Sequence, residues 1–123
     1  MAVRGIRGAI TTDQDIDVKI RESTKLLLEE IVKVNPNLHP DDIASIFFTV
    51  SHDLSSEYPA HAAREFGWTH VPLLCAQETP VPGGLERCIR ILILWNTELP
   101  QSNIRHVYLR EAQKLRPDLK ENQ

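Results

Sequence analysis

The stretch CAQETPVPGGLERCIRILILW, residues 75–95, holds the side chains best suited to chemistry. Cys75 and Glu78 lie three residues apart, just before a turn rich in proline and glycine, and Arg90 follows inside an apolar run. A guanidinium cannot shed its proton, so burying one without a partner is costly. Arg90 therefore needs an anion. It is either half of a structural ion pair with Glu78 or another acid, or part of a binding site for an anionic ligand.

Arg7 favours the ligand-site interpretation. It alternates with Gly5 and Ala9 on one face of a segment with strand character, and such small neighbours leave room for a bound molecule. Arg64 and Arg116 either extend the same site or lie on the surface. The residues alone predict an arginine-lined pocket for a compact anion, without naming a reaction.

Metal and covalent chemistry find little support in the sequence. The five histidines are spread along the chain without the spacing of paired ligands, so we expect no metal site. Cys75 has no local nucleophile signature, and a cysteine in a strand is more often a small packing residue. Tyr108 either donates a hydrogen bond or belongs to the core.

Length and composition indicate one ordinary globular domain. The chain has 123 residues, of which 41% are hydrophobic and 25% charged, with a formal net charge of −3. This charge favours neither nucleic acid nor an anionic membrane as a partner. There is no apolar segment suited to a signal peptide or a membrane span, and two cysteines make no disulfide framework. We expect a cytoplasmic protein with a single domain over 1–123 and a flexible tail at 117–123.

The hydrophobic pattern predicts the elements that must position these residues. Over 15–34, apolar residues recur at spacings of three, four and seven, which indicates an amphipathic helix, with Thr12 or Asp13 as its cap. The run at 88–97 is apolar on both faces and is typical of a central strand. Further strands are expected at 3–12, 41–53, 71–77 and 104–109, and short helical segments at 60–66 and 110–115.

This order of elements predicts an α+β fold, with a mixed β-sheet and helices on one face. The chain is small, and many of its strand positions are apolar. Such a sheet needs a second surface to cover it, so we expect an oligomer.

Three separated blocks of the chain carry the residues discussed so far. They are RGIRGAIT at the start, CAQE followed by GGLERCIR in the middle, and IRHVYL followed by LRPDL at the end. In order and spacing these blocks closely resemble the monofunctional AroH-type chorismate mutases of bacilli and their relatives, which is more specific than any single motif. The resemblance implies a Claisen rearrangement of chorismate to prephenate, in phenylalanine and tyrosine biosynthesis, without metal or cofactor.

The same resemblance implies an assembly. That family forms a homotrimer in which mixed sheets pack around a central core, as a trimeric pseudo-α/β barrel. Its three active sites lie in clefts between neighbouring subunits. The partners implied for this chain are therefore chorismate, prephenate and further copies of the chain itself.

Residue roles follow from the resemblance position by position. Arg90 is implied to contact the ether oxygen and a carboxylate of chorismate, and Arg7 to bind a carboxylate. Glu78 is implied to accept the ring hydroxyl, with Cys75 beside it, and Tyr108 to hydrogen-bond the ligand. The other implied binding residues are Leu74, Ala76 and Gln77 through the backbone, Tyr58, Ala60 and Arg64 in the segment that closes the cleft, and Leu115 and Arg116 in a C-terminal lid.

Two further interpretations stay open. A trimeric imine or enamine hydrolase of similar architecture would also use an arginine for a carboxylate, but it must activate water, so its activity should vary with pH. A non-enzymatic sensor of small carboxylates would bind chorismate without converting it. The chain also departs from the better-known family members, which have lysine at the position of His61 and often threonine at that of Leu74.

Overall fold

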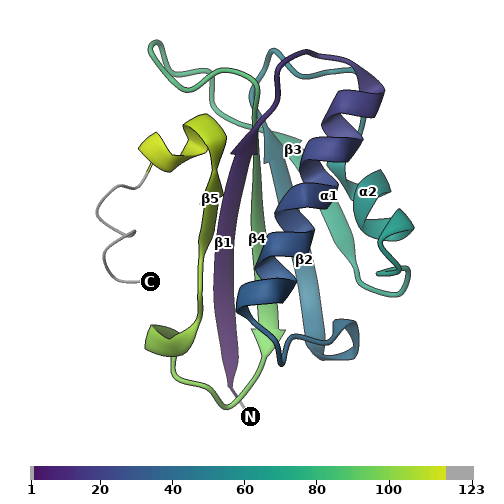
Figure 1. The fold of residues 1–123 in the computed structure, drawn as a ribbon, viewed down its shortest axis with the longest axis vertical. Coiled ribbons are helices and arrows are strands. Elements are labelled where there is room, and N and C mark those ends of the chain that lie inside the picture. Colours follow the sequence, from purple (N-terminus) through teal and green to yellow (C-terminus); the bar gives the residue numbers. More distant parts are fainter. Residues whose placement is uncertain (1, 116–123) are drawn as a thin grey trace.

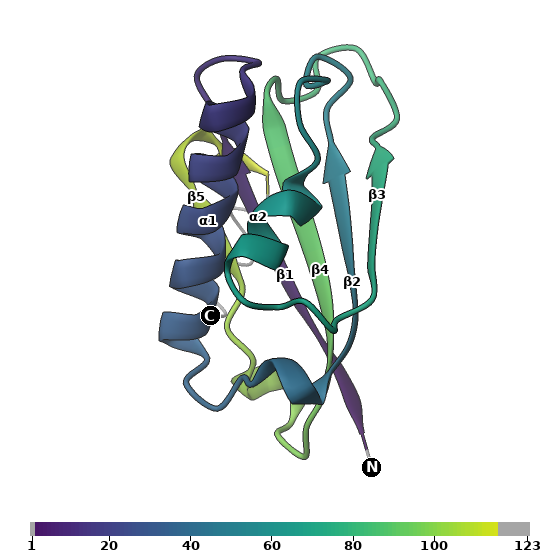
Figure 2. The same ribbon diagram turned by 90° about the vertical axis from the view of Figure 1, so that its right-hand side faces the viewer.

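The computed structural model describes residues 2–115. Within that range five strands form one mixed sheet in the order β3-β2-β4-β1-β5, and the two α-helices lie on one face of it (Figures 1 and 2). The predicted α+β fold, a mixed sheet with helices on one face, is confirmed. The elements are β1 (Val3–Thr11), α1 (Asp17–Val34), β2 (Ile43–Val50), α2 (Pro59–Glu65), β3 (Leu73–Gln77), β4 (Cys88–Asn96) and β5 (Val107–Leu109), with 3-10 helices at Pro40–Asp42, Gln101–Asn103 and Arg110–Lys114.

β4 is the central strand, as its apolar sequence predicted. It pairs antiparallel with β1 on one side and with β2 on the other, while β5 and β3 join the edges in parallel. This register sets Arg90 opposite Ala9 of β1 and Thr49 of β2. Paired backbone therefore flanks the arginine on both sides.

α1 packs against the sheet through the apolar stripe that its periodicity predicted. Leu27, Leu28 and Ile31 have no exposed surface. The helix comes close to the sheet at Gly8, where an added Cβ would lie 3.0 Å from Ile91 and 3.1 Å from Ile31. Only glycine leaves the space that this approach requires.

The start of α1 differs from the prediction. Thr12 or Asp13 was expected to cap the helix, but the helix begins after Ile16 without a side-chain cap. The neighbouring Asp15 binds the loop before α2 instead. Its carboxylate accepts hydrogen bonds from the N–H groups of Ser55 and Ser56, both at 3.0 Å, and these bonds, that of Ser55 above all, lower the pKa of Asp15.

The last predicted strand is shorter than expected, since only Val107–Leu109 pairs with β1. Beyond this pairing, two side chains hydrogen-bond the backbone of β1. His106 Nδ1 accepts a hydrogen bond from the N–H of Arg7 at 2.9 Å. The amide of Gln101 bonds both the N–H and the C=O of Gly5, at 3.0 and 2.7 Å. These contacts fix the backbone of β1 around Arg7.

The face of the sheet opposite the helices is largely uncovered (Figure 2). Apolar side chains on this face stay exposed to different degrees: Val3 by 53%, Phe47 by 39%, Leu74 by 60% and Leu92 by 36%. An exposed apolar surface of this kind is typical of an interaction site. Within residues 2–115 no helix has the length and apolar character needed to cross a membrane. The flexible tail predicted at 117–123 lies outside the described residues.

Candidate active site

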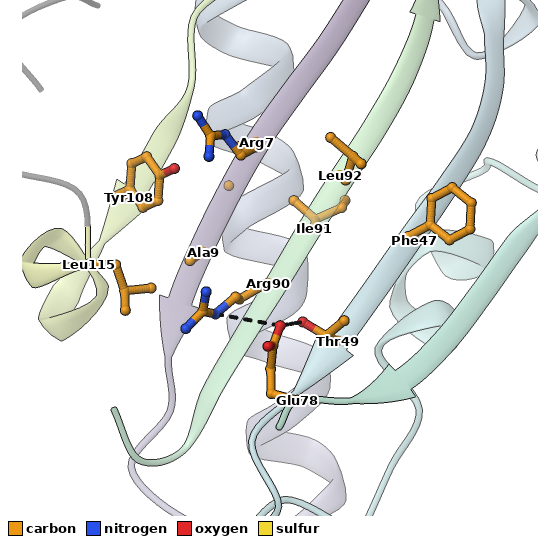
Figure 3. A pocket seen from close by; sticks show the side chains of 11 residues that line it. Arg7, Ala9, Phe47, Thr49, Glu78, Arg90, Ile91, Leu92, Tyr108 and Leu115 are labelled. Atoms are coloured by element: carbon orange, nitrogen blue, oxygen red, sulfur yellow. Dashed lines mark hydrogen bonds and ion pairs between the residues drawn. The ribbon is translucent and has the colours of Figure 1, made fainter. Parts of the chain in front are cut away.

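Five of the predicted site residues line one cavity in the uncovered face (Figure 3): the apolar Leu115 and four polar residues. Arg7 comes from β1, Arg90 from β4, Tyr108 from β5 and Glu78 from the turn after β3. The cavity measures about 290 Å³, near the lower end of the range for small-molecule sites. Its apolar lining includes Ala9, Phe47, Ile91, Leu92 and Leu115.

Arg90 and Glu78 form the charged centre of this cavity. Arg90 Nε lies 3.8 Å from Glu78 Oε2, and both side chains remain partly exposed. The Nε atom itself is buried and has no hydrogen-bond partner within the described residues. The two interpretations of Arg90 are therefore compatible, because it forms a loose ion pair and still faces a cavity.

Thr49 is a third member of this centre, and the sequence analysis missed it. Its hydroxyl donates a hydrogen bond to Glu78 Oε2 at 2.5 Å, and the residue lines the same cavity. The alternation of side chains in β2 was enough to put Thr49 on one face of the sheet. No local pattern showed that this face holds Arg90, because that depends on the strand register.

Arg7 and Tyr108 complete the polar lining. Within residues 2–115 neither the guanidinium of Arg7 nor the hydroxyl of Tyr108 makes a hydrogen bond or an ion pair. Both side chains border the cavity, near the small Ala9 (Figure 3). Their polar groups are therefore available to a ligand.

Cys75 does not join this cavity within a single chain. It pairs with Phe48 of β2, and its side chain packs against the core under the helices, whereas Arg90 faces the other side of the sheet. Within one chain, therefore, Cys75 and Arg90 lie on opposite faces of the sheet. Cys75 lies inside β3 while Glu78 lies beyond its end, so the turn can bring only Glu78 to the Arg90 side.

The predicted residues of α2 also lie away from Arg90. Ala60 is 5% exposed in the core under the helices, and Arg64 is exposed on the same helix. Tyr58 is 68% exposed and lines, with Cys75, a second cavity of about 440 Å³.

The remaining predicted residues are spread over several places. Ala76 and Gln77 line the second cavity, and Leu74 lies on the uncovered face. Leu115 lines the first cavity, and Arg116 lies outside the described residues.

Asp53 anchors the start of β4, and the sequence analysis missed this residue too. Its carboxylate accepts hydrogen bonds from the N–H of Arg87 at 3.1 and 3.0 Å and from the hydroxyl of Ser51 at 2.5 Å. Arg87 has a φ of +48°, an uncommon conformation for a side chain of its size. The Ser51 hydroxyl in turn accepts a hydrogen bond from the N–H of Cys88 at 2.9 Å. This network fixes the strand that carries Arg90.

Cys88 lies close to the cavity but is 2% exposed, in a cluster with Ala9 and Ala112. Burial raises the pKa of the Cys88 thiol, and the nearby charge of Arg90 opposes this shift without cancelling it. The thiol is therefore protonated at neutral pH and is a poor nucleophile. Among residues 2–115 there is also no group of three or more His, Cys, Asp or Glu side chains that could hold a metal ion.

An open sheet face with two arginines, a carboxylate and a phenol around a small cavity defines a protein that acts on, or binds, a compact anion. The sequence matches the family described as chorismate mutase type I over residues 3–119. By this match the chain belongs to that family. The prediction of a chorismate mutase, an isomerase, is confirmed at the level of the family, and neither the hydrolase nor the sensor is favoured.

Individual relatives agree with this membership. A protein named chorismate mutase AroH from Thermus thermophilus is 52% identical over 121 residues, which cover 98% of this chain and 99% of the relative. The protein of the same name from Bacillus subtilis (strain 168) is 45% identical over 120 residues, covering 97% and 94%. A solved structure of a chorismate mutase from Clostridium thermocellum has a TM-score of 0.86 at 44% identity, covering 89% of this chain and 97% of that one.

Proposed function

We propose that this chain rearranges chorismate to prephenate in the cavity between Arg7, Glu78, Arg90 and Tyr108, as an isomerase of phenylalanine and tyrosine biosynthesis. The observation that carries the proposal is the convergence of these four side chains in a member of the chorismate mutase family. Chorismate has two carboxylates, a ring hydroxyl and an enolpyruvyl ether. Two arginines match the carboxylates, and a glutamate matches the hydroxyl.

The reaction needs little chemistry from the protein. It is unimolecular: the ether C–O bond breaks and a C–C bond forms within the same molecule, so no proton, cofactor or covalent intermediate is required. In the transition state the C–O bond is broken further than the C–C bond is formed, so negative charge builds on the ether oxygen. The protein therefore has two tasks, which are to hold the chair-like conformer and to present fixed positive charge to that oxygen.

Arg90 supplies the fixed charge. Its guanidinium is planar and always protonated, so one N–H can meet the ether oxygen while another meets a carboxylate. The backbone pairing of β4 with β1 and β2 holds its strand, and so does the network around Asp53. A charge held in this way needs little reorganisation when the transition state forms.

The other three side chains hold the conformer. Arg7 binds the second carboxylate, Tyr108 donates a hydrogen bond to the ligand, and Glu78 accepts a hydrogen bond from the ring hydroxyl. Because these groups belong to different strands or turns, they grip the substrate at separate points. Several fixed contacts restrict the substrate to few conformers, which lowers the entropic part of the barrier.

We further infer a cytoplasmic homotrimer with one active site in each cleft between subunits. The exposed apolar side chains of the uncovered face support this assembly, because a second copy would bury them. Tyr58, Ala60 and Arg64 lie away from the Arg90 cavity of their own chain. In the proposed trimer, these three residues and Cys75 of one subunit line the cleft that contains Arg90 of its neighbour.

Further contacts complete the cleft in this proposal. The backbone of Leu74, Ala76 and Gln77 lines it, and Leu115 begins a lid that continues with Arg116 and covers the bound substrate.

An ultraviolet assay tests the activity. Purified protein should consume chorismate and form prephenate, with no added metal or cofactor. Calorimetry that detects chorismate binding under conditions where no prephenate forms would contradict the proposal and favour a sensor.

Mixing two inactive variants tests the clefts between subunits. Arg90→Ala and Arg64→Ala subunits, refolded together, should regain activity, because roughly a quarter of randomly paired clefts then hold both arginines. The matched control mixes Arg90→Ala with Arg7→Ala, whose residues line one cavity of one chain, so no native cleft can form. Equal activity in the two mixtures would exclude the arrangement.

A further inference from the structure

Glu78 is held through only one of its two carboxylate oxygens. Thr49 Oγ1 donates to Oε2, and Arg90 Nε faces that same oxygen at 3.8 Å; Figure 3 draws both contacts on it. Within the described residues, Oε1 makes no hydrogen bond and no ion pair. One oxygen is therefore tied to the protein, and the other is free in the cavity.

We propose that Thr49 is a positioning residue for the rearrangement, whose hydroxyl orients Glu78 so that Oε1 meets the ring hydroxyl of chorismate and Arg90 keeps its charge for the ether oxygen. This inference rests on the role proposed above for Glu78. Thr49 acts through that carboxylate rather than on the reacting atoms.

Backbone pairing fixes the position of Thr49 from both sides. In β2 it lies opposite Arg90 of β4 and beside Ala76 of β3, so its side chain stands on the uncovered face next to the guanidinium. The N–H of Glu78 donates to the C=O of Val50 at 2.8 Å, which extends the pairing of β2 and β3 past the end of β3. Because threonine is β-branched and has few side-chain conformers, its hydroxyl is a rigid donor at this point.

The hydrogen bond from Thr49 also controls how closely Glu78 approaches Arg90. A free carboxylate beside a guanidinium favours a bidentate pair with two short N–H···O contacts. Such a pair would occupy both oxygens of Glu78 and offset much of the positive charge that the ether oxygen requires. With Oε2 held by Thr49, the arginine and the glutamate stay 3.8 Å apart. Both groups then remain available to the substrate.

Two substitutions at position 49 separate the hydroxyl from the shape of the side chain. Thr49→Val removes the donor and should lower kcat/KM by roughly 10- to 100-fold, as expected for a hydrogen bond to a charged group. Thr49→Ser keeps the donor and should restore most of that loss. Thr69→Val, on an exposed loop, is the matched control and should leave activity unchanged. Full activity of Thr49→Val would overturn the inference, as would equal losses in the valine and serine variants.

A double-mutant cycle then asks whether the hydroxyl acts through the carboxylate. Glu78→Ala should lower activity, and adding Thr49→Val to it should cause little further loss, because the partner of the hydroxyl is already gone. If Thr49→Val lowers activity by the same factor in both backgrounds, the inference fails while the role of Glu78 stands. If Glu78→Ala is fully active, the proposed role of Glu78 fails first and the inference falls with it.

Discussion

Two neighbouring residues, Phe47 and Phe48, show how different the two faces of the sheet are. Phe48 points toward the helices and is 1% exposed, while Phe47 points the other way and is 39% exposed. The helix-covered face is filled with apolar side chains packed in one cluster. The uncovered face carries Arg7 and Arg90 among apolar residues that stay accessible.

This difference separates the stability of the chain from its chemistry. Contacts that hold the fold lie on the helix-covered face, so substitutions there should act on the free energy of unfolding. The four polar side chains around the Arg90 cavity, and the exposed apolar residues proposed for subunit contacts, lie on the uncovered face. Substitutions of these residues should act on turnover or on assembly. The following predictions test that separation.

Arg90→Ala should produce the largest effect. We expect turnover of chorismate to fall on the order of 10³-fold or more, because even a single oxyanion donor contributes 10²- to 10³-fold. The melting temperature should hardly move, since the only ion pair of Arg90 among the described residues is loose and partly solvated. Steady-state assays and thermal unfolding of the same preparation measure the two effects. Near-normal turnover would remove Arg90 from the mechanism.

Phe48→Ala should have the opposite signature. Removing a large buried side chain lowers the free energy of unfolding by about 3–5 kcal/mol. Turnover per folded molecule should be nearly unchanged, because Phe48 faces away from the cavity. Urea unfolding, combined with an assay corrected for the folded fraction, makes the test. A large loss of turnover in the folded fraction would show that the two faces are coupled.

Phe47→Asp should act on assembly. A carboxylate on the uncovered face makes burial against a second copy unfavourable, whereas the isolated chain tolerates a charge at a site already 39% exposed. Sedimentation should therefore show smaller particles, and the circular dichroism of the backbone should be preserved. A particle of unchanged mass at micromolar concentration would contradict the proposed interface.

The two cysteines should show the smallest effects. Cys75→Ser should be mild, because the proposed rearrangement needs no thiolate. In the native protein Cys75 should be alkylated before Cys88, because Cys88 is buried and has a raised pKa. Mass spectrometry measures the extent of alkylation at each cysteine over time.

The raised pKa of Cys88 also predicts a pH effect on stability. Its unfolded thiol ionises near the ordinary pKa of 9.0, before the folded one does. The contribution of Cys88 to stability is therefore complete below pH 9.0 and falls as pH rises through the folded pKa. Unfolding measured across this range should show a steeper decline in the native sequence than in Cys88→Ala. Equal slopes would contradict this assignment.

Local signals in the sequence were enough to predict several elements. The helix at Asp17–Val34 and the central strand at Cys88–Asn96 each leave a pattern in neighbouring residues, through periodicity in one and apolar character on both faces in the other. Arg90 could be identified as a site residue because a charged side chain inside an apolar strand needs a partner of opposite charge. The family could be recognised because three separate blocks agreed.

Other features depend on contacts between distant residues. Thr49 meets Glu78 from 29 positions away, and Asp53 meets Arg87 from 34, so no window of the sequence shows either contact. The face occupied by Cys75 follows from the register of β3 on β2, which pairs Cys75 with Phe48, and a shift of one residue would reverse that face. Cys75 was placed beside Glu78 by the family resemblance, which carries no information on which subunit supplies each side chain.

The amide of Gln101 has a consequence for solubility. β1 is nine residues long, but three of its residues pair with β5, and unpaired N–H and C=O groups on an edge recruit strands from unrelated molecules and start aggregation. Gln101 occupies both groups of Gly5 as a neighbouring strand would. The chain thus exposes an apolar face while closing part of a backbone edge, which limits indiscriminate β-pairing.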